Sequence, residues 1–291
     1  MLLSLIGEEQ VRAIQAIPEF SGNTDYNMID IAKTLDYMNR LYVDTIARHV
    51  DLSEARLCDC GAGFGWLSFT YLLRGGAAAV IVEPHEGKLA AARQIAAILD
   101  LADRCEFRSD FLQEIDLPDK SIDVFASIET LEHVGKQNIR PAIGNIRRLT
   151  KSLVVVTTPN LLSPWVSHDA QVPFSHWLPI PWRDGFIRLF GKRYRGFNHF
   201  AAPWHLMALH DGFRPVSRVL TFDTYQAWLD HYPFYSPYGE ARIKQAPSAA
   251  MKAFFGAISL LFGRYSFWVC PNMGSVWLAR QAVGAATASK G

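Results

Sequence analysis

The stretch Leu57-Cys58-Asp59-Cys60-Gly61-Ala62-Gly63-Phe64-Gly65 places three glycines at alternate positions directly after a short apolar run. Residues 55–60 predict a buried strand, and the apolar residues 66–73 predict a helix after it. Glycine allows a sharp backbone turn, and it allows a ligand to come closer than a Cβ atom would permit. A strand, a glycine turn and a helix N-terminus in this order predict a nucleotide-binding crevice at the carboxyl end of a parallel sheet.

The spacing of the glycines separates two cofactor classes. The dinucleotide fingerprint G-x-G-x-x-G, started at Gly61, requires glycine at position 66, where this chain has Trp66. This difference disfavours a nicotinamide-dependent dehydrogenase. The observed pattern is D-x-G-x-G-x-G, with Asp59 two positions before Gly61, and it resembles the first motif of the class I S-adenosylmethionine-dependent methyltransferases. An ordinary tight loop is the alternative for the turn taken alone.

The rest of the chain continues the strand–helix alternation of a parallel sheet. Further strands are expected at 78–83, 105–110, 122–128, 152–158, 213–222 and 275–280, with intervening helices at 87–99 and 139–149. The predicted fold class is therefore α/β, a Rossmann-like seven-stranded and mostly parallel sheet with helices on both faces. The resemblance implies that the last strand is antiparallel and lies between the fifth and sixth strands.

The order of the predicted elements, together with the resemblance, implies several regions in and around this sheet. They are an N-terminal helical cover (1–54), the S-adenosylmethionine-binding core (55–160), an aromatic lid insertion (161–202), a C-terminal part of the sheet (203–281) with a second insertion (223–273), and a disordered tail (282–291).

Acidic residues end two of the predicted strands. The resemblance implies that Glu83 accepts hydrogen bonds from the ribose hydroxyls and that Asp110 accepts one from the adenine amino group. It places Asp59 near the ammonium group of the methionine moiety, directly or through water. The expected cofactor-binding residues are Asp59, Gly61, Ala62, Gly63, Gly65, Glu83, Pro84, Asp110, Phe111 and Glu129.

The string Ile128-Glu129-Thr130-Leu131-Glu132-His133-Val134 follows the fourth strand and resembles the corresponding motif of the ubiquinone-pathway O-methyltransferases. In a helical turn Glu129, Glu132 and His133 would share a face. His133 is then a candidate general base, because its ordinary pKa lies near neutral pH. Alternatively, the three residues bind a divalent cation such as Mg²⁺ that acidifies a substrate hydroxyl. A third interpretation makes Glu132 and His133 caps of the next helix.

Two further segments are candidates for substrate or surface contacts. The lid is rich in aromatic residues and resembles a segment of bacterial glycan and natural-product methyltransferases, which makes His168 and His176 candidate catalytic or substrate-contacting residues; packing on the sheet is the alternative. Residues 182–195 alternate apolar and basic side chains, which predicts peripheral contact with a membrane or an anionic substrate, or a solvated helix face. The apolar stripe at 249–262 predicts a core helix, a homodimer face or a cover for an apolar substrate.

Composition narrows the range of partners. The chain has 291 residues, of which 49% are apolar, and its 29 basic residues nearly balance its 28 acidic ones, so nothing favours a nucleic-acid partner. Four scattered cysteines suit neither a disulfide scaffold nor a zinc site. The first residues lack a basic segment, and no apolar run is long enough to span a bilayer, so we expect a cytoplasmic protein.

The sequence thus predicts an enzyme that uses S-adenosylmethionine to methylate a small molecule, with a hydroxyl oxygen as the first choice of acceptor. The alternatives are methylation of carbon or nitrogen, for which an apolar pocket without a base suffices, and a non-catalytic subunit that only binds the cofactor. Methyl transfer is an in-line displacement, so alignment supplies much of the acceleration and no catalytic residue is obligatory.

Overall fold

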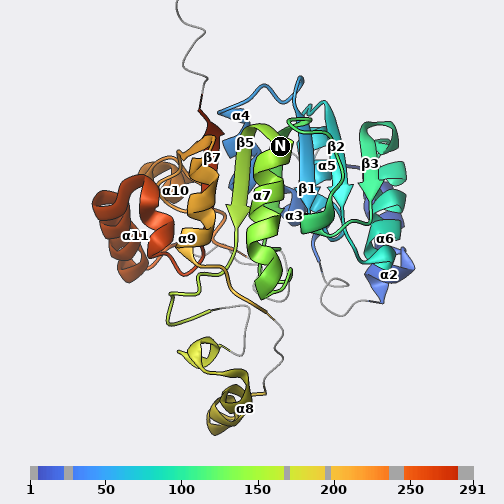
Figure 1. Ribbon diagram of the computed structural model, residues 1–291. Helices are drawn as coiled ribbons and strands as arrows, with labels where there is room; N and C mark the ends of the chain where they lie inside the picture. The colour runs from blue at the N-terminus through green and yellow to red at the C-terminus, as the bar shows by residue number, and fades with distance from the viewer. Residues whose placement is uncertain (1–5, 23–28, 167–170, 194–197, 236–245, 281–291) are drawn as a thin grey trace, which may run out of the picture.

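Seven strands form one sheet in the order β3-β2-β1-β4-β5-β7-β6 in the computed structural model (Figure 1). The structure describes residues 6–22, 29–166, 171–193, 198–235 and 246–280. The strands are β1 (Arg56–Cys60), β2 (Ala78–Val82), β3 (Cys105–Arg108), β4 (Ile122–Ile128), β5 (Thr150–Thr157), β6 (Phe213–Pro215) and β7 (Ser275–Ala279). The first five are parallel, and β7 runs antiparallel between β5 and β6. The predicted fold class is confirmed.

Helices cover both faces of the sheet, and the alternation of side chains along each strand gives each face its own core. Leu57 and Ile81 pack on one face, under α3 (Ile31–Met38), α5 (Trp66–Leu73) and α6 (Glu86–Ile98). Cys58 and Val80 pack on the other face, where α7 (Ile139–Leu149) and α9 (Pro203–Leu206) complete the core. The order of strands reverses beside β1, so the glycine turn lies at the position where α/β sheets bind ligands.

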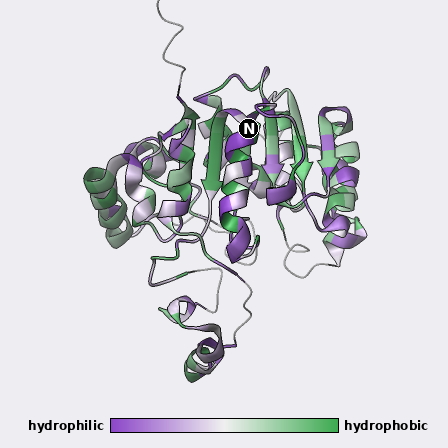
Figure 2. Cartoon of the chain, in the orientation of Figure 1, coloured by the Kyte–Doolittle hydropathy of each residue, from purple (hydrophilic) through white to green (hydrophobic). Residues whose placement is uncertain are grey.

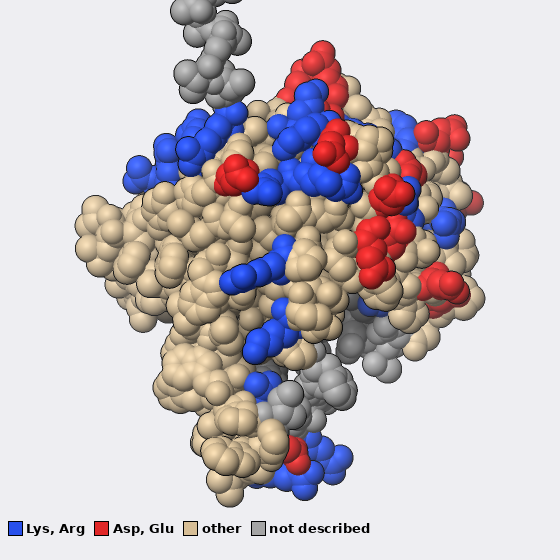
Figure 3. All heavy atoms as spheres, in the orientation of Figure 1, with Lys and Arg blue, Asp and Glu red and all other residues tan. Residues whose placement is uncertain are grey.

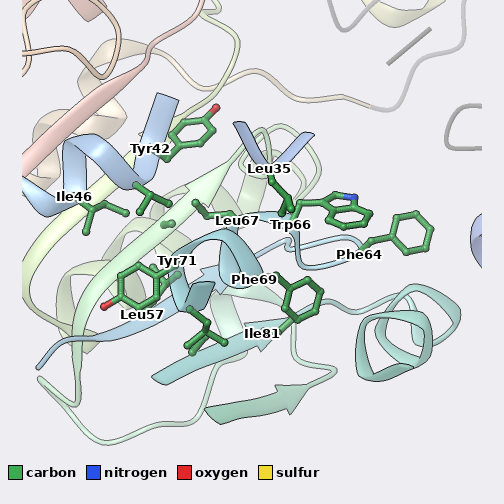
Figure 4. Close-up of a cluster of buried hydrophobic side chains, with 14 of the residues drawn as sticks. Leu35, Tyr42, Ile46, Leu57, Phe64, Trp66, Leu67, Phe69, Tyr71 and Ile81 are labelled. Atoms are coloured by element: carbon green, nitrogen blue, oxygen red, sulfur yellow. The ribbon is translucent and has the colours of Figure 1, made fainter. Parts of the chain in front are cut away.

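Trp66 is a core residue, which explains why it stands at the third-glycine position of the dinucleotide pattern. It is the first residue of α5, and its ring meets the rings of Phe20 and Phe69 edge-on, with centroid distances of 6.0 Å and 6.5 Å. Figure 4 shows Trp66, Leu67 and Phe69 grouped with side chains of the strands and of the N-terminal helices. This packing fixes the helix that follows the glycine turn.

The described part of the N-terminal region is largely helical. Its helices are α1 (Glu8–Gln15), α2 (Pro18–Ser21), α3, a π-helical turn (Asn39–Val43) and α4 (Asp44–Ala47). The helices α1 and α2 contact α6, and α3 contacts α5. The region therefore covers one face of the sheet through α5 and α6, and its part at 23–28 lies outside the described residues.

The two insertions carry the remaining elements. The first holds a 3-10 turn (Ser175–Trp177) and α8 (Ile180–Leu189), which stands beyond the carboxyl ends of the strands (Figure 1). The second holds α10 (Tyr225–His231), α11 (Ala249–Phe262) and a 3-10 segment (Gly263–Trp268). Short 3-10 turns lie at Ala102–Arg104, Leu112–Glu114, Lys136–Asn138 and Met207–His210.

Three predicted segments differ from the structure or extend outside its described residues. The sixth strand ends at Pro215, because Val219 and Phe222 bridge each other in a turn of their own. The basic amphipathic segment is helical only to Leu189, and Arg195 lies outside the described residues. The predicted disordered tail also lies outside them. Among the described residues, no helix has the length and apolar character needed to cross a membrane.

Candidate functional site

The three glycines of the turn have positive φ angles, and each is needed for a different reason. A Cβ on Gly61 would lie 2.2 Å from Oγ1 of Thr130, and one on Gly65 would lie 2.9 Å from the ring of Phe69. A Cβ on Gly63 would meet no atom within 4 Å. Gly61 and Gly65 therefore leave room for other parts of the protein, whereas Gly63 faces open space that a ligand can enter.

Glu83 connects the end of β2 to this turn. Its Oε2 accepts a hydrogen bond of 2.8 Å from the backbone N–H of Gly63, and its Oε1 accepts one of 2.9 Å from the N–H of His85. The turn is also attached to β2 by hydrogen bonds from Gly61 N and Ala62 N to the carbonyl oxygen of Val82. A buried carboxylate thus lies beside the open face of Gly63, and the neighbouring Pro84 is exposed.

Asp59, near the end of β1, has an enclosed carboxylate. Its carboxylate is only 3% exposed, and Oδ2 accepts hydrogen bonds from the N–H (3.2 Å) and the hydroxyl (2.8 Å) of Ser68 on α5. Burial raises the pKa of Asp59 to about 6, although the bonds from Ser68 lower it. Because the carboxylate is enclosed and holds the start of α5, a direct contact with a cofactor ammonium group is not supported; a contact through water stays a prediction.

Asp110 and Phe111 lie just beyond β3, which ends at Arg108 instead of at the expected Asp110. Oδ2 of Asp110 is 2.5 Å from Nε of Arg108. The Nη1 atom of the same arginine lies 3.3 Å from Oε1 of Glu106. The ring of Phe111 is about half exposed, at 54%. This edge therefore offers an exposed aromatic face beside a carboxylate that is already paired.

Thr130 joins the motif after β4 to the glycine turn. Its hydroxyl lies 3.0 Å from the carbonyl oxygens of both Cys60 and Ile128, and it occupies the space that a Cβ on Gly61 would need. The two sequence motifs are thus complementary in shape as well as adjacent in the sheet.

Glu129 lies at the carboxyl end of β4 with a positive φ of 50°, which is uncommon for a residue other than glycine. Its N–H donates to the carbonyl oxygen of Thr157 at 2.9 Å, and its Oε1 accepts a hydrogen bond of 2.5 Å from the side-chain amide of Asn272. Backbone and side chain are therefore both held by the neighbouring strand ends. Strained backbone that is fixed in this way is typical of functional sites.

The side chains of Tyr42 and Tyr232 interact electrostatically with Glu129. Burial raises the pKa of Tyr42 well above its ordinary value, and Tyr37 and Glu129 raise it further, while a hydrogen bond with Thr157 lowers it. Burial and then Glu129 also raise the pKa of Tyr232. Both phenols therefore stay neutral and interact electrostatically with the Glu129 carboxylate.

The divalent-cation site expected at Glu129, Glu132 and His133 is not formed. Residues 131–133 make a turn instead of a helix, with a hydrogen bond from His133 N to Thr130 O. Glu129 meets Asn272, Glu132 is buried and accepts a bond of 3.1 Å from the hydroxyl of Thr158, and His133 is exposed. No group of three or more His, Cys, Asp or Glu side chains is placed to hold a metal ion in the described ranges.

The candidate histidines have different environments. His133 is exposed on the turn after β4, and its role as a general base stays a prediction. His176 is 5% exposed; its Nε2 lies 3.2 Å from the carbonyl oxygen of Leu161, and its ring packs against Trp177 and Phe200. This burial supports the packing interpretation of His176. His168 lies outside the described residues.

Several residues at this edge were not expected from the sequence. Asn272 precedes β7, far along the chain from β4, and Tyr42 comes from the N-terminal region. Neither belongs to a local motif, so only the three-dimensional fold brings them to Glu129. The positive φ of Glu129 has no signal in the sequence either.

Comparisons with known proteins agree with this geometry. Residues 57–152 match the family model described as methyltransferase domain. Two ubiquinone biosynthesis O-methyltransferases of Neisseria meningitidis, from serogroups C and A, are each 34% identical over 103 residues. These matches cover 35% of this chain and 43% of each relative, so the chain spans less than half the length of the curated relatives it matches.

The solved structures that this chain resembles are more distant in sequence. Geranyl diphosphate C-methyltransferase from Streptomyces coelicolor A3(2) is 15% identical, with 85% of this chain and 74% of that chain covered and a TM-score of 0.46. Magnesium protoporphyrin IX methyltransferase from Synechocystis PCC 6803 is 16% identical, with coverages of 71% and 84% and a TM-score of 0.45. The likeness rests on the sequence matches, in which residues 57–152 of this chain are similar to a methyltransferase domain.

Proposed function

We propose that this protein transfers the methyl group of S-adenosylmethionine to a hydroxyl oxygen of a small molecule. The similarity of residues 57–152 to methyltransferase domains supports the reaction class. The structure supports the cofactor through the open face of Gly63, beside the Glu83 carboxylate and within the same sheet edge as the exposed ring of Phe111. When bound, S-adenosylmethionine supplies an electrophilic methyl group on a positively charged sulfur.

The observation that carries the choice of a hydroxyl acceptor is the fixed carboxylate of Glu129. An alcohol or phenol must lose its proton as its oxygen attacks, so it needs a nearby acceptor, whereas carbon and neutral nitrogen nucleophiles have less need of one. Glu129 stands at the end of β4, is aligned by Asn272 and has neutral phenols around it. It is better placed for this role than His133, which lies on the solvent side of the following turn.

The first experiment is a calorimetric titration with S-adenosylmethionine and with NADH. Binding of the former alone supports the proposal, and no binding of S-adenosylmethionine would refute it. The second experiment incubates the protein with methyl-labelled S-adenosylmethionine and a panel of phenols, aliphatic alcohols and amines. Label in ether products supports the hydroxyl acceptor; label only in amines or on carbon favours the alternatives. Binding without transfer to any acceptor would favour a non-catalytic cofactor-binding protein.

A further inference from the structure

The helix α8 exposes large apolar side chains on the side that faces away from the protein. Trp182 is 70% exposed, Leu189 is 82% exposed, and Phe190, which directly follows the helix, is 56% exposed. Trp182 and Leu189 are seven positions apart and therefore lie on one face of the helix. We call Trp182, Leu189 and Phe190 the α8 face. Large apolar side chains exposed together on one short helix are a candidate interaction surface.

The opposite side of α8 is firmly attached to the lid. Ile187 is fully buried, and the guanidinium of Arg183 donates hydrogen bonds to the carbonyl oxygens of His176 (2.8 Å) and Leu178 (3.2 Å). With Ile187 and Arg183 turned inward, the helix cannot rotate its apolar residues into the protein without breaking these contacts. The outward position of the α8 face is therefore built into the lid.

The 3-10 turn beside α8 adds a second apolar pair. The rings of Phe174 and Trp177 lie 5.1 Å apart, and both side chains are about half exposed. The indole N–H of Trp177 donates to the carbonyl oxygen of Leu161 at 2.6 Å, so the polar end of this side chain has a partner within the protein. What remains outside is the apolar part of the ring. Tryptophan presented in this manner is common where proteins meet a membrane interface.

The basic residues of α8 and of the segment after it indicate the kind of partner that this surface binds. Residues 180–193 contain four basic residues and one acidic residue, and the three basic residues other than the inward Arg183 are exposed, although the whole chain has a formal net charge of only +1. Arg188 pairs with Asp184 at 2.7 Å on the flank of the helix, and Lys192 and Arg193 follow it at exposed positions. Figure 3 shows Lys and Arg gathered at this end of the molecule, where Figure 2 shows the apolar residues of the same helix. Apolar side chains flanked by cations match an anionic lipid surface.

We propose that the α8 face binds to bilayers that contain anionic phospholipid, with Trp182, Leu189 and Phe190 entering the interface and Arg188, Lys192 and Arg193 meeting the head groups. A bilayer fits better than a second copy of the chain. A helix of ten residues is about 15 Å long, and one face of it is small beside the roughly 1,200–2,000 Å² of a stable protein interface.

This docking also orients the candidate active site. The α8 helix stands beyond the carboxyl ends of the strands, which is the edge that carries Gly63, Glu83 and Glu129 (Figure 1). A protein attached through α8 turns that edge toward the lipid. An extension that rests on the proposed function is that the acceptor is an amphiphilic alcohol or phenol held in the bilayer.

Vesicle flotation tests the membrane proposal directly. The full chain is mixed with vesicles of equimolar phosphatidylglycerol and phosphatidylcholine, or with vesicles of phosphatidylcholine alone. We expect the protein to float with the anionic vesicles, to be released by high salt, and to float weakly with the neutral ones. Each basic residue near an anionic surface strengthens binding about fivefold, so the triple variant R188Q/K192Q/R193Q should bind about a hundredfold more weakly.

The apolar contribution is tested with Trp182→Ser/Leu189→Ser, which should bind anionic vesicles at least tenfold more weakly. The matched control is Leu260→Ser/Leu261→Ser on α11, because these leucines are also highly exposed; it should float like the wild type. Thermal unfolding should be unchanged in the α8 variant. Its calorimetric binding of S-adenosylmethionine should also be unchanged, since these residues lie outside the cofactor crevice.

Three results would overturn the membrane proposal. The wild type could stay in the soluble fraction with anionic vesicles, or the α8 and α11 variants could lose binding equally. Alternatively, sedimentation could show a dimer that Trp182→Ser/Leu189→Ser converts into monomers, which would make the α8 face an interface between copies. Failure to bind S-adenosylmethionine with intact vesicle binding would instead refute the proposed function and leave the docking surface standing.

Discussion

The carboxylate of Glu83 accepts a hydrogen bond from the backbone N–H of Gly63, and this bond joins the end of β2 to the open part of the glycine turn. The same carboxylate accepts from His85 N, so both of its oxygens act as acceptors toward backbone donors. The position of the turn therefore depends on a group that is itself at the edge of the proposed cofactor crevice.

Glu83→Gln should weaken S-adenosylmethionine binding about 10- to 100-fold, because one amide position turns an acceptor into a donor that faces a backbone N–H, and a hydrogen bond to a charged group contributes roughly 1.5–3 kcal/mol. Calorimetric titration measures the change. Glu86→Gln, on the exposed first turn of α6, is the control and should bind normally. Equal affinities of the two variants would exclude Glu83 from the site.

Gly63→Val should abolish S-adenosylmethionine binding in a protein that still folds, because the new side chain fills the space left open at the turn. Gly75→Val is a close control. Gly75 also has a positive φ and no atom within 4 Å of a Cβ, but it follows α5 at the other end of that helix. A side chain at positive φ costs each variant about 1–2 kcal/mol of folding free energy, so the two should have similar unfolding temperatures. Loss of S-adenosylmethionine binding in Gly63→Val alone would then support the cofactor crevice at Gly63. Affinity retained within a few-fold in Gly63→Val would mean that the cofactor binds elsewhere.

Glu129→Gln should slow methyl transfer by about 10²–10⁴-fold while leaving S-adenosylmethionine affinity within a few-fold, since the amide cannot take up the hydroxyl proton. Asn272→Ala should also lower the rate. The double variant Glu129→Gln/Asn272→Ala should lose less than the sum of the two single effects on the activation free energy, because both changes act on one carboxylate. His133→Ala should have a small effect. Single-turnover rates with the best acceptor measure these effects. A large loss of rate in His133→Ala together with a normal rate in Glu129→Gln would identify His133, and not Glu129, as the general base.

The buried carboxylate of Asp59 predicts a pH-dependent stability. Its pKa is raised by burial to about 6, so the folded state holds the proton more tightly than the unfolded chain does. The stabilisation is complete below about pH 4 and is lost as the pH rises through about 6, a change of about 3 kcal/mol relative to Asp59→Asn. Urea unfolding of both proteins between pH 4 and pH 7 measures it, with exposed Asp103→Asn as the control. Parallel curves for wild type and Asp59→Asn would contradict the inference.

Local patterns in the sequence were sufficient to predict the order of the strands and helices of the sheet. The helices at 66–73, 139–149 and 249–262 begin and end where the apolar periodicity predicted. Pro141 did not prevent the second of these, because it lies in the first helical turn, where backbone N–H groups have no partner within the helix. The predicted ends of the second and fourth strands lie within one residue of the ends of β2 and β4, whereas β3 ends at Arg108, before the predicted Asp110.

The side-chain partners at the site were less predictable, because they depend on distant parts of the chain. Nothing near Asp59 in the sequence shows that Ser68 will enclose its carboxylate. The partnership of Glu129 with Asn272 spans the whole second insertion, and the turn at 131–133 replaced the helix on which the metal interpretation depended. Local periodicity reports which face of an element is buried, but it does not report which polar groups meet across it.

The position of β7 has a consequence for how the sheet is completed. β7 is the last of the seven strands in sequence, yet it lies between β5 and β6 and pairs with both. Until it arrives, β5 has an open edge and β6 has no partner in the sheet. During synthesis, therefore, the parallel half can form early, whereas the final closure waits for a contact between segments far apart in the chain, a kind of contact that forms slowly. A chain cut before Ser275 would expose the β5 edge to pairing with other chains.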